Sequence, residues 1–380
     1  MFILNETNFA LSRNFRLQSF GNLKWLMDTY NFSKIAFYID EIIIIDVSRN
    51  QRSLEKFCNV IISDVVKIER ASLGLKRILG LPVRMIKCGL LLYRLNKKYD
   101  RHIVYSNTMA VFGAFFYGLL GGKTIGHVHE IILKPKFLSK LMCFNYSCFN
   151  RYLIFNSNAS YQWFVNNGGI NKRGEVVHNG VEAQTYMYEE FKEDKVLKVA
   201  LVGRINKWKG HSLLIDAISR LDNKLNFSVH FYGDVYGQQS YFIDELKAKL
   251  SCYQLSSRFT FHGFISNHDF WKNIDLLVVP STEPEPFGMV AIEAMARAIP
   301  VIGSNHGGLA EILANGNGLL FEPNNVLSLS EKLNDAITSS TLRAELARRG
   351  YEAALNDFSV DVYGRKILNV IQEMINDGKK

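Results

Sequence analysis

The chain has 380 residues and a mass of 43.4 kDa, which is enough for two ordinary domains that each bury a core. Its hydrophobic content of 48% and mean hydropathy of −0.01 exclude an intrinsically disordered or fibrous protein. The net charge of +9 arises in the first half, where residues 1–180 hold 24 Lys and Arg against 11 Asp and Glu, and this predicts an anionic partner such as nucleic acid, a phospholipid surface or a phosphorylated substrate.

The first half of the chain alternates apolar runs with helical stretches, which predicts an α/β domain. The first fifty residues show no clear pattern, because Asp40 and Glu41 interrupt the apolar run Ile35–Ile45. Apolar runs predict buried strands at Ile42–Val47, His102–Tyr105, Lys123–Val128 and Tyr152–Phe155.

The second half alternates strands and helices more clearly, which predicts βαβ units around a parallel sheet. The predicted strands are Val196–Gly203, Asn226–Gly233, Arg258–Phe261, Asp275–Pro280, Ile299–Gly303 and Gly318–Phe321. The main predicted helices are about His211–Leu221, Gln238–Leu250, Val326–Thr338, Thr341–Leu355 and Val360–Asp377.

These patterns divide the chain into two domains. We predict an N-terminal domain over residues 1–180 and a C-terminal domain over residues 196–358. The polar, acidic segment 181–195 between them lacks strong periodicity and is predicted to be a linker.

The sequence L-V-G-R-I-N-K-W-K-G, residues 201–210, places two cations after a predicted strand. The strand ends at Gly203, and Arg204 and Lys209 follow in the loop that leads to a helix. Open parallel sheets bind ligands beyond the carboxyl ends of their strands, and a guanidinium and an ammonium beside a helix N-terminus suit a diphosphate. A solvated loop with ordinary surface cations is the alternative.

The sequence E-P-E-P-F-G-M-V-A-I-E-A-M-A, residues 283–296, places two carboxylates after another predicted strand. Glu285 lies in the loop and Glu293 in the helix that follows, and Gly288 near the helix start lets a ligand approach backbone N–H groups. Carboxylates accept hydrogen bonds from both hydroxyls of a sugar diol. Glu293 could instead pair with Arg297 on a helix surface, but its apolar neighbours predict a buried helix, where a lone carboxylate needs a partner.

The order and spacing of these residues resemble those of the retaining GT-B glycosyltransferases of family 4, the glycosyltransferase group 1 type. The family pattern K-G … P-S-x3-E-x-F-G-x4-E-A-M-A-x3-P-V-I is nearly matched by P-S-T-E-P-E-P-F-G-M-V-A-I-E-A-M-A-R-A-I-P-V-I, from Pro280 to Ile302. Arg204 and Lys209 precede it as R-x4-K-G, and G-G-L-A-E, residues 307–311, follows the next strand. Bacterial polysaccharide and O-antigen glycosyltransferases are similar in this way.

The resemblance implies two Rossmann-like parallel-sheet domains that face an interdomain cleft, with the last helix, about residues 360–380, packing back on the first domain. It implies that Arg204 and Lys209 hold the nucleotide diphosphate and stabilise its charge as it leaves. It also implies that Glu293 accepts hydrogen bonds from the ribose hydroxyls and that Glu285 accepts one from the donor sugar.

The resemblance implies further contacts with the donor. The base is expected to lie against backbone groups of His262, Gly263, Phe264 and Ile265. The other donor contacts implied by the motifs are those of Gly203, Gly210, Phe287, Gly288 and Met289. Asn179, with Gly180 and Val181, matches the family's N-G-V segment at the hinge.

In the first half of the chain, G-H-V-H-E, residues 126–130, lies at the end of a predicted strand. The family often has a histidine here that faces the donor sugar, which favours His129. Strand alternation places His127 and His129 on the same side, and the alternative for either ring is a satisfied core histidine. The residues predicted to be catalytic are therefore His129, Arg204, Lys209 and Glu285.

One feature of the family is missing from the sequence. Family members usually open with a strand and a glycine-rich loop near the acceptor site, and residues 1–34 do not reproduce them. Gly21 in S-F-G-N-L is a poor substitute. We therefore expect an acceptor loop that is divergent, or a start that is shortened.

Two basic stretches of the first half carry interleaved apolar residues. Leu73–Arg101 holds eight Lys and Arg against one Asp, and Ile131–Arg151 holds four and no acid. Such a surface suits an anionic membrane, the alternative being a solvated helix face over an ordinary core. No nucleic-acid-binding module is recognisable, so nucleic acid is not an expected partner.

The sequence also bears on location. It lacks a signal-peptide pattern at its start, its five Cys form no C-x-x-C pair, and no apolar run is long enough to span a bilayer. We therefore expect a cytoplasmic protein, peripheral on the inner face of the cell membrane.

Together these observations predict an enzyme, a hexosyltransferase-type glycosyltransferase. It would move a sugar from a nucleotide-sugar donor, a UDP-sugar being favoured and GDP-mannose next, to a hydroxyl of a lipid-linked oligosaccharide in O-antigen or capsule synthesis, with retention at the anomeric carbon. No Asp-x-Asp motif calls for a metal, so no cofactor and no metal are predicted. The alternatives are a sugar-nucleotide epimerase of the same fold and a degenerate, non-catalytic scaffold in a polysaccharide assembly complex.

Overall fold

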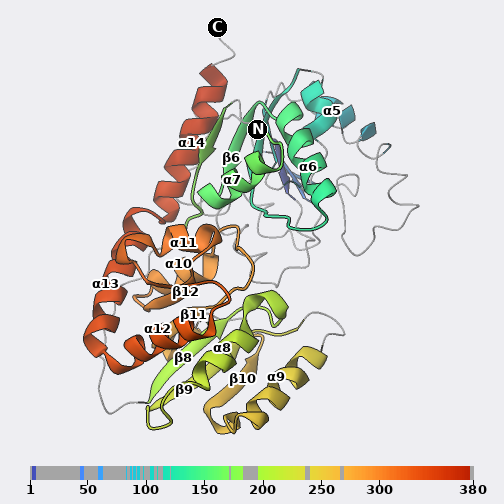
Figure 1. Ribbon diagram of the computed structural model, residues 1–380. Helices are drawn as coiled ribbons and strands as arrows, with labels where there is room; N and C mark the ends of the chain where they lie inside the picture. The colour runs from blue at the N-terminus through green and yellow to red at the C-terminus, as the bar shows by residue number, and fades with distance from the viewer. Residues whose placement is uncertain are drawn as a thin grey trace. The chain divides into compact units, whose positions relative to one another are not determined.

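The computed structural model describes residues 2–5, 43–46, 59–62, separate positions between 83 and 97, and residues 103–106, 109, 114–119, 121–170, 173–182, 196–235, 240–265 and 269–376. The chain divides into two compact units, residues 1–178 with 363–380, and residues 179–362. Each unit has its own sheet flanked by helices (Figure 1).

The first unit contains a seven-stranded sheet in which every pairing is parallel. Its strands are β1 Phe2–Asn5, β2 Ile43–Asp46, β3 Asn59–Ile62, β4 Ile103–Ser106, β5 Lys123–Val128, β6 Tyr152–Phe155 and β7 Gly174–Val176. Its described helices include α5 Ala114–Leu119, α6 Lys136–Phe149, α7 Asn158–Asn166 and α14 Val360–Asn376. The strand order is β3-β2-β1-β4-β5-β6-β7.

The second unit contains a six-stranded parallel sheet. Its strands are β8 Leu197–Val202, β9 Phe227–Tyr232, β10 Phe259–Gly263, β11 Leu276–Val279, β12 Val301–Ser304 and β13 Leu319–Phe321. Its helices include α8 His211–Ile218, α9 Tyr241–Cys252, α10 Met289–Met295, α11 Gly307–Ile312, α12 Val326–Thr338 and α13 Ser340–Asn356. The strand order is β10-β9-β8-β11-β12-β13.

Both sheets have doubly wound topology. In each unit the chain builds outward from its first strand, then returns to the other side of that strand and builds in the opposite direction. In the second unit this reversal falls between β8 and β11, which are hydrogen-bonded neighbours. Ligands of open α/β sheets bind at the carboxyl ends of the strands at such a reversal.

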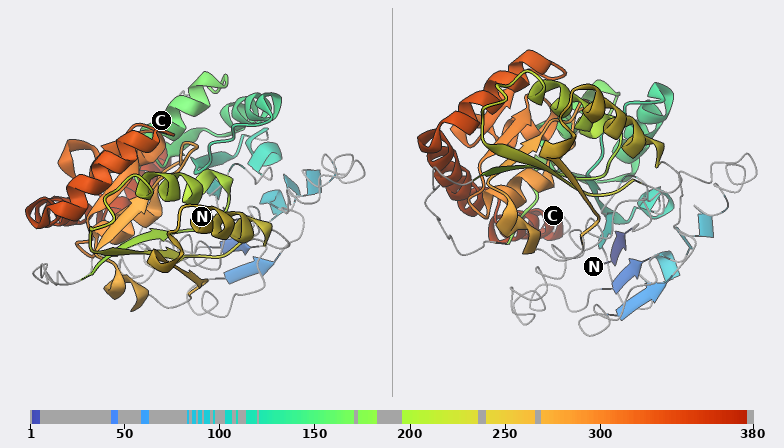
Figure 2. Two further views of the ribbon diagram at one scale, coloured as in Figure 1. Left: turned by 60° about the horizontal axis from the view of Figure 1, so that its bottom comes forward. Right: turned by 90° about the horizontal axis from the view of Figure 1, so that it is seen from below.

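Helices cover both faces of the sheet of the second unit (Figure 2). One face carries Leu201, Val229 and Phe231, packed with residues of α8, α9 and α12. The other carries Ala200 and Tyr232, packed with residues of α10, α11 and α13. Because both faces are covered at the centre of the sheet, β8 and β11 are largely apolar, and the sequence predicts them well.

The structure confirms the predicted α/β fold with two parallel-sheet units. The prediction was wrong about the start of the chain, which does open with a strand: β1 lies in the middle of its sheet, between β2 and β4. Its apolar run is only three residues long before Asn5, too short to show a period. The predicted glycine-loop region, residues 6–34, and most of the predicted linker, residues 183–195, lie outside the described residues.

The segment around Asn179 begins the second unit. Asn179 is 6% exposed, and the next residues lie beside the chain before α14: the Val181 N–H donates to Phe358 O at 2.8 Å and the Val360 N–H donates to Val181 O at 3.1 Å. A Cβ on Gly180 would lie 2.6 Å from the Val360 Cα atom. The N-G-V segment therefore needs its glycine for close backbone contact, and its hinge role stays a prediction.

Helix α14 packs on the first unit. The Lys123 ammonium on β5 donates to the Met374 carbonyl oxygen at 3.2 Å. Tyr363, near the start of α14, stacks on the buried His127 ring with centroids 6.4 Å apart.

Gly210 and Gly121 have nearly the same φ but different surroundings, so substituting each of them tests how tightly the loop before α8 is packed. Gly210 has φ 77°, and a Cβ there would lie 1.8 Å from the Pro280 carbonyl oxygen; Gly121 has φ 81° and no atom within 4 Å of its Cβ position. Gly121→Ala should cost only the left-handed backbone strain, about 1–2 kcal/mol. Gly210→Ala adds a backbone clash and should cost about 3 kcal/mol or more, a fall in Tm of about 6 °C or more. Equal Tm values for the two variants in thermal unfolding would contradict this packing.

Candidate functional site

The candidate site lies at the carboxyl ends of β8 and β11, where the sheet of the second unit reverses its order. The loop after β8, residues 203–210, and the loop after β11, residues 280–288, both start from this edge. Because neighbouring parallel strands end at the same edge, the two predicted motifs are brought together although they lie far apart in sequence.

The loop after β8 is folded tightly at its first residue. Gly203 has φ 154°, and a Cβ on Gly233 would lie 1.9 Å from the Gly203 carbonyl oxygen. Asn206 then caps a 3₁₀ turn at Lys207–Lys209, because its side-chain oxygen accepts from the Lys209 N–H at 3.0 Å. This cap fixes the backbone from which the Lys209 side chain extends.

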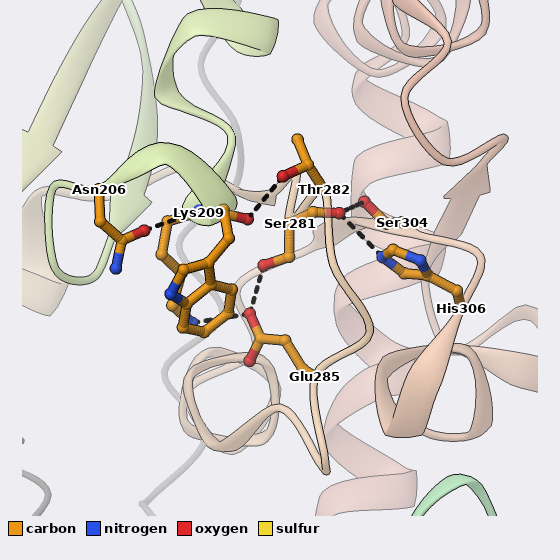
Figure 3. A network of polar contacts seen from close by, with 8 residues as sticks. Asn206, Lys209, Ser281, Thr282, Glu285, Ser304 and His306 are labelled. Carbon is orange, nitrogen blue, oxygen red and sulfur yellow. Dashed lines mark hydrogen bonds and ion pairs between the residues drawn. The ribbon is translucent and has the colours of Figure 1, made fainter. Parts of the chain in front are cut away.

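Lys209 and Glu285 form an ion pair with 2.7 Å between Nζ and Oε1 (Figure 3). Only 16% of the Lys209 side chain and 9% of the Glu285 side chain are exposed. The Ser281 hydroxyl also donates to Oε1 of Glu285. Burial alone would raise the pKa of Glu285, but the Lys209 charge and the hydrogen bonds from Lys209 and Ser281 outweigh burial and hold that pKa below its usual value.

The Ser281 backbone is itself held by two donors from the neighbouring strand end (Figure 3). Its carbonyl oxygen accepts from the Ser304 hydroxyl at 2.8 Å and from His306 Nε2 at 2.9 Å, which fixes the His306 tautomer with a proton on Nε2. His306 also makes a small electrostatic contribution that lowers the pKa of Glu285. Sequence reasoning did not select Ser281, Ser304 or His306, although Ser281 stands in the quoted P-S-x3-E motif and His306 precedes Gly307-Gly308.

A second set of contacts joins the two loops. The Thr282 N–H donates to Trp208 O at 2.7 Å, and the Thr282 hydroxyl donates to the same oxygen at 3.3 Å. Lys209 Nζ lies 4.3 Å from the centre of the Trp208 ring. The ammonium therefore has a carboxylate and an aromatic face as neighbours, an arrangement that favours a cation in a partly dry site.

Arg204, the other predicted cation, is partly buried in the same loop. It lies next to Gly203, whose N–H donates to Tyr232 O at 2.8 Å, and before Ile205, whose N–H donates to Asp234 O at 3.1 Å. The backbone on both sides of Arg204 is therefore tied to the segment that follows β9.

Glu293 lies in the second turn of α10. Its Oε1 atom is buried and has no hydrogen-bond partner among the described residues. Burial raises the pKa of Glu293 to about 7, although the Arg297 charge opposes the shift. Arg297 donates to the Glu293 carbonyl oxygen at 2.7 Å, so the predicted alternative, a surface pair of the two side chains, is not what the structure shows.

Residues 287–289 connect the second loop to α10. Gly288 has φ 124°, which an L-residue rarely adopts, and the buried Phe287 ring packs against Phe358 with centroids 6.1 Å apart. Met289 packs against the core as a partly buried residue. With its ring turned into the core, Phe287 could offer a ligand its backbone, as the motif predicts.

The segment predicted to hold the base lies two strands away from β8, at the end of β10. His262 stacks on Tyr232 with ring centroids 4.3 Å apart and planes at 4°. Gly263 has φ 65° with no atom within 4 Å of a Cβ position, and Phe264 is 40% exposed, while Ile265 is partly buried. The segment is thus open, with an aromatic stack at its base.

The sequence of this unit matches a known family. Residues 183–353 match the model of the family "Glycosyl transferases group 1". The second unit therefore resembles a group 1 glycosyl transferase domain. The matched residues include Lys209, Glu285 and Glu293, and thus both loops of the candidate site.

Relatives of known name match about half of this chain. An uncharacterized glycosyltransferase of Methanocaldococcus jannaschii is 38% identical over 184 residues, which cover 48% of this chain and 49% of the relative. The capsular polysaccharide biosynthesis glycosyltransferase CapM of Staphylococcus aureus is 26% identical over 211 residues, 53% of this chain and 54% of CapM. The chain spans about half the length of the curated relatives it matches first.

Solved structures resemble the whole chain. The Anabaena protein HepE, solved in complex with UDP and glucose, superposes with a TM-score of 0.76 over 98% of both chains at 22% identity. The two units therefore have the GT-B fold of glycosyltransferases.

In the first unit, His127 and His129 follow the predicted alternation. Their rings lie 3.8 Å apart between centroids, beside each other at the end of β5. His127 is fully buried and its Nδ1 lies 2.6 Å from the Tyr105 hydroxyl, which also bonds Tyr363. Burial lowers the pKa of His129 to about 4, so its imidazole is neutral at physiological pH.

The backbone around His129 is fixed by polar contacts. The Glu130 carboxylate accepts from the His129 N–H at 3.1 Å and from the Met109 N–H at 3.3 Å. The Asn156 amide donates to the His129 carbonyl oxygen at 3.5 Å. Tyr105 and Glu130 thus support the histidine pair, and sequence reasoning selected neither.

Among the described residues, no group of three or more His, Cys, Asp or Glu could hold a metal ion. The helices of the same residues include none that is both long and apolar enough to span a bilayer.

The raised pKa of Glu293 predicts that nucleotide binding depends on pH and releases a proton. Only an ionised carboxylate accepts hydrogen bonds from both ribose hydroxyls, so binding should lower this pKa and release up to one proton near pH 6.5. The affinity for the nucleotide should therefore rise with pH, by at most about tenfold per pH unit, until about pH 7. Above that pH it should be constant.

Calorimetry of a nucleotide-sugar in buffers of different ionisation enthalpy measures this proton. A nucleotide-sugar is the better probe, because its diphosphate diester does not titrate in this range. Glu293→Gln should bind with no proton release. Release of the same size from wild type and Glu293→Gln would show that another group titrates.

Proposed function

We propose that the protein is a hexosyltransferase that moves a sugar from a nucleotide-sugar donor to a hydroxyl, with retention at the anomeric carbon. The observation that carries the proposal is the Lys209–Glu285 pair at the carboxyl edge of a group 1 glycosyl transferase domain. The pair brings an ammonium into contact with a carboxylate, a group that is suited to accept hydrogen bonds from sugar hydroxyls.

The main work of the site is to stabilise the leaving diphosphate. Lys209 is already held in a partly buried position by Glu285, so its charge needs little reorganisation when a phosphate oxygen becomes a further partner. Arg204, in the same loop, supplies the second cation. A preorganised cationic pair facing a developing negative charge lowers the barrier most where water is excluded.

The two carboxylates divide the recognition of the donor. Lys209 and Ser281 both contact Oε1 of Glu285, which leaves Oε2 as the acceptor for a sugar hydroxyl. Glu293 accepts from the ribose, which gives its buried Oε1 atom the hydrogen bonds it lacks in the described structure. The base lies against the backbone of residues 262–265, and the His262–Tyr232 stack supports that segment.

The names of the relatives favour a cell-surface polysaccharide as the product. CapM is named for capsular polysaccharide biosynthesis, and HepE was solved with UDP and glucose. We therefore propose a UDP-sugar as the favoured donor, with GDP-mannose next, and a lipid-linked oligosaccharide as the acceptor. The basic first half would keep the protein on the anionic inner face of the cell membrane, where such an acceptor is found.

Removal of the Lys209 ammonium tests the site directly. The donor is first chosen by thermal shift with UDP, GDP, dTDP and their sugars, since a ligand at 100 times its Kd adds about 2.7 kcal/mol of stability. Lys209→Ala should then reduce the transfer rate about a hundredfold or more. The matched control is Lys207→Ala, which removes an exposed cation from the same turn and should leave the rate nearly unchanged.

Two further measurements make this test decisive. The Tm of Lys209→Ala is recorded, because loss of the ammonium leaves the buried Glu285 charge without its partner. Product analysis separates transfer from epimerisation, in which the nucleotide-sugar changes but no nucleotide is released. Wild-type transfer by a folded Lys209→Ala protein would disprove the site, and absence of any turnover by wild type would favour a non-catalytic scaffold.

Metal removal tests the role of the two cations. We propose that Arg204 and Lys209 neutralise the diphosphate without a metal ion, so that protein treated with EDTA should transfer sugar at the rate of untreated protein. Loss of activity that Mg²⁺ or Mn²⁺ restores would show that the cations are not sufficient.

A further inference from the structure

Helix α6 carries large apolar side chains on its exposed face. Phe137 is 71% exposed, Leu141 57% and Phe144 56%. Their spacing of four and three residues puts them on one side of the helix, so they form a single stripe. We call these three side chains the α6 stripe.

The opposite side of α6 is an ordinary core face. Met142, Cys143 and Tyr146 are buried and pack with the apolar ends of β5 and β6. The helix is thus apolar on two sides, and packing within the first unit accounts for only one of them. A stripe of exposed Phe and Leu is unusual on a protein surface and marks an interaction site.

The charges around the stripe are of one sign. Lys136 and Lys140 lie on α6 itself and Lys134 directly before it, and the whole segment Ile131–Arg151 has no Asp or Glu. Lys136 and Lys140 are exposed and border the stripe. The partner of this face therefore has negative charges beside an apolar layer.

A second segment of the same unit has the same character. Among the described helical positions between 83 and 97, the exposed apolar residues are Val83, Ile86, Leu90 and Tyr93, with exposed fractions of 53%, 44%, 48% and 49%. The exposed cations of that stretch are Lys87, Arg94 and Lys97. Two separate segments thus combine exposed apolar groups with cations.

We propose that α6 docks the protein on an anionic lipid surface, with Phe137, Leu141 and Phe144 inserted among the acyl chains and the flanking lysines on lipid phosphates. The helix lies in the plane of the interface, because its 14 residues extend about 21 Å and cannot cross a hydrocarbon core of about 30 Å. An amphipathic helix with cations beside its apolar face is the form that interfacial binding requires.

A second copy of the chain fits this face less well. It would bring one acid-free, lysine-bearing segment against another, and the repulsion would oppose the apolar contact. An anionic lipid satisfies both the stripe and the lysines, because its phosphate and its acyl chains lie side by side.

The inference rests on the proposed function only for its biological purpose, which is to bring the donor site to a lipid-linked acceptor. Docking itself is measured on vesicles without donor or acceptor. Failure to dock and failure to transfer are therefore separate results.

The experiment uses the full-length protein and extruded vesicles of phosphatidylcholine with or without phosphatidylglycerol, in a flotation assay. Wild type should float with the phosphatidylglycerol vesicles and only weakly with pure phosphatidylcholine. Leu141→Asp and Phe144→Asp should each weaken partitioning about tenfold or more. Lys136→Ala and Lys140→Ala should each weaken it about fivefold at low salt and less at high salt, because one lysine near the surface acts through a screened charge.

The matched control is Leu327→Asp, since Leu327 on α12 is 56% exposed and lies in the second unit. It should bind vesicles as wild type does. Thermal unfolding checks that the α6 variants fold, and because more than half of each substituted side chain is exposed, their Tm should stay close to the wild-type value.

Three results would overturn the proposal. Wild type could fail to float with anionic vesicles. The α6 variants could float as well as wild type and Leu327→Asp. Light scattering could show that wild type is a dimer, that Leu141→Asp is a monomer, and that neither binds vesicles. This result would assign the α6 stripe to contact with a second copy of the chain.

Discussion

Lys209 and Glu285 are separated by 76 positions in the chain, yet their side chains meet at 2.7 Å because β8 and β11 are neighbours whose carboxyl ends share one edge. A buried ion pair contributes little net stability, since both charges lose hydration, but loss of one partner is costly. The main effect of the pair is therefore to fix positions: it holds an ammonium and a carboxylate at the point where the strand order of the sheet reverses, without a bound ligand. Ser281, Ser304 and His306 keep the carboxylate in place from the other side.

The second carboxylate of the site, Glu293, has a pKa shifted in the opposite direction. Glu285 is kept charged by Lys209 and Ser281, whereas burial moves the pKa of Glu293 to about 7. Two carboxyl groups with different pKa values can serve two purposes, one as a fixed charge and the other as a group that exchanges a proton with its ligand. The environment alone sets this difference, since both residues are glutamates in one motif.

The sequence was informative where a local pattern decides the structure. The strands β8 and β11 are largely apolar, and the loops that carry the site follow from where these two strands end. It was less informative about β1, whose apolar run is three residues, and about β7, a strand with two exposed residues out of three. The roles of His306 and Tyr105 depend on contacts with residues far away in the sequence, which no local pattern shows. The size of the pKa shift of Glu293 likewise depends on its burial in the folded unit.

Close backbone contacts restrict which residues can be substituted in one part of the second unit, whereas another part has no such restriction. Gly203 and Gly233, Gly210 and Pro280, and Gly307 and Glu285 approach so closely that a methyl group would not fit between them. The end of β10 has no such restriction, because the space beside Gly263 is open and Phe264 is exposed. Substitutions in the segment proposed to bind the base, residues 262–265, can therefore accumulate while the loop 203–210 stays the same. Donor preference can then change during evolution without loss of the fold.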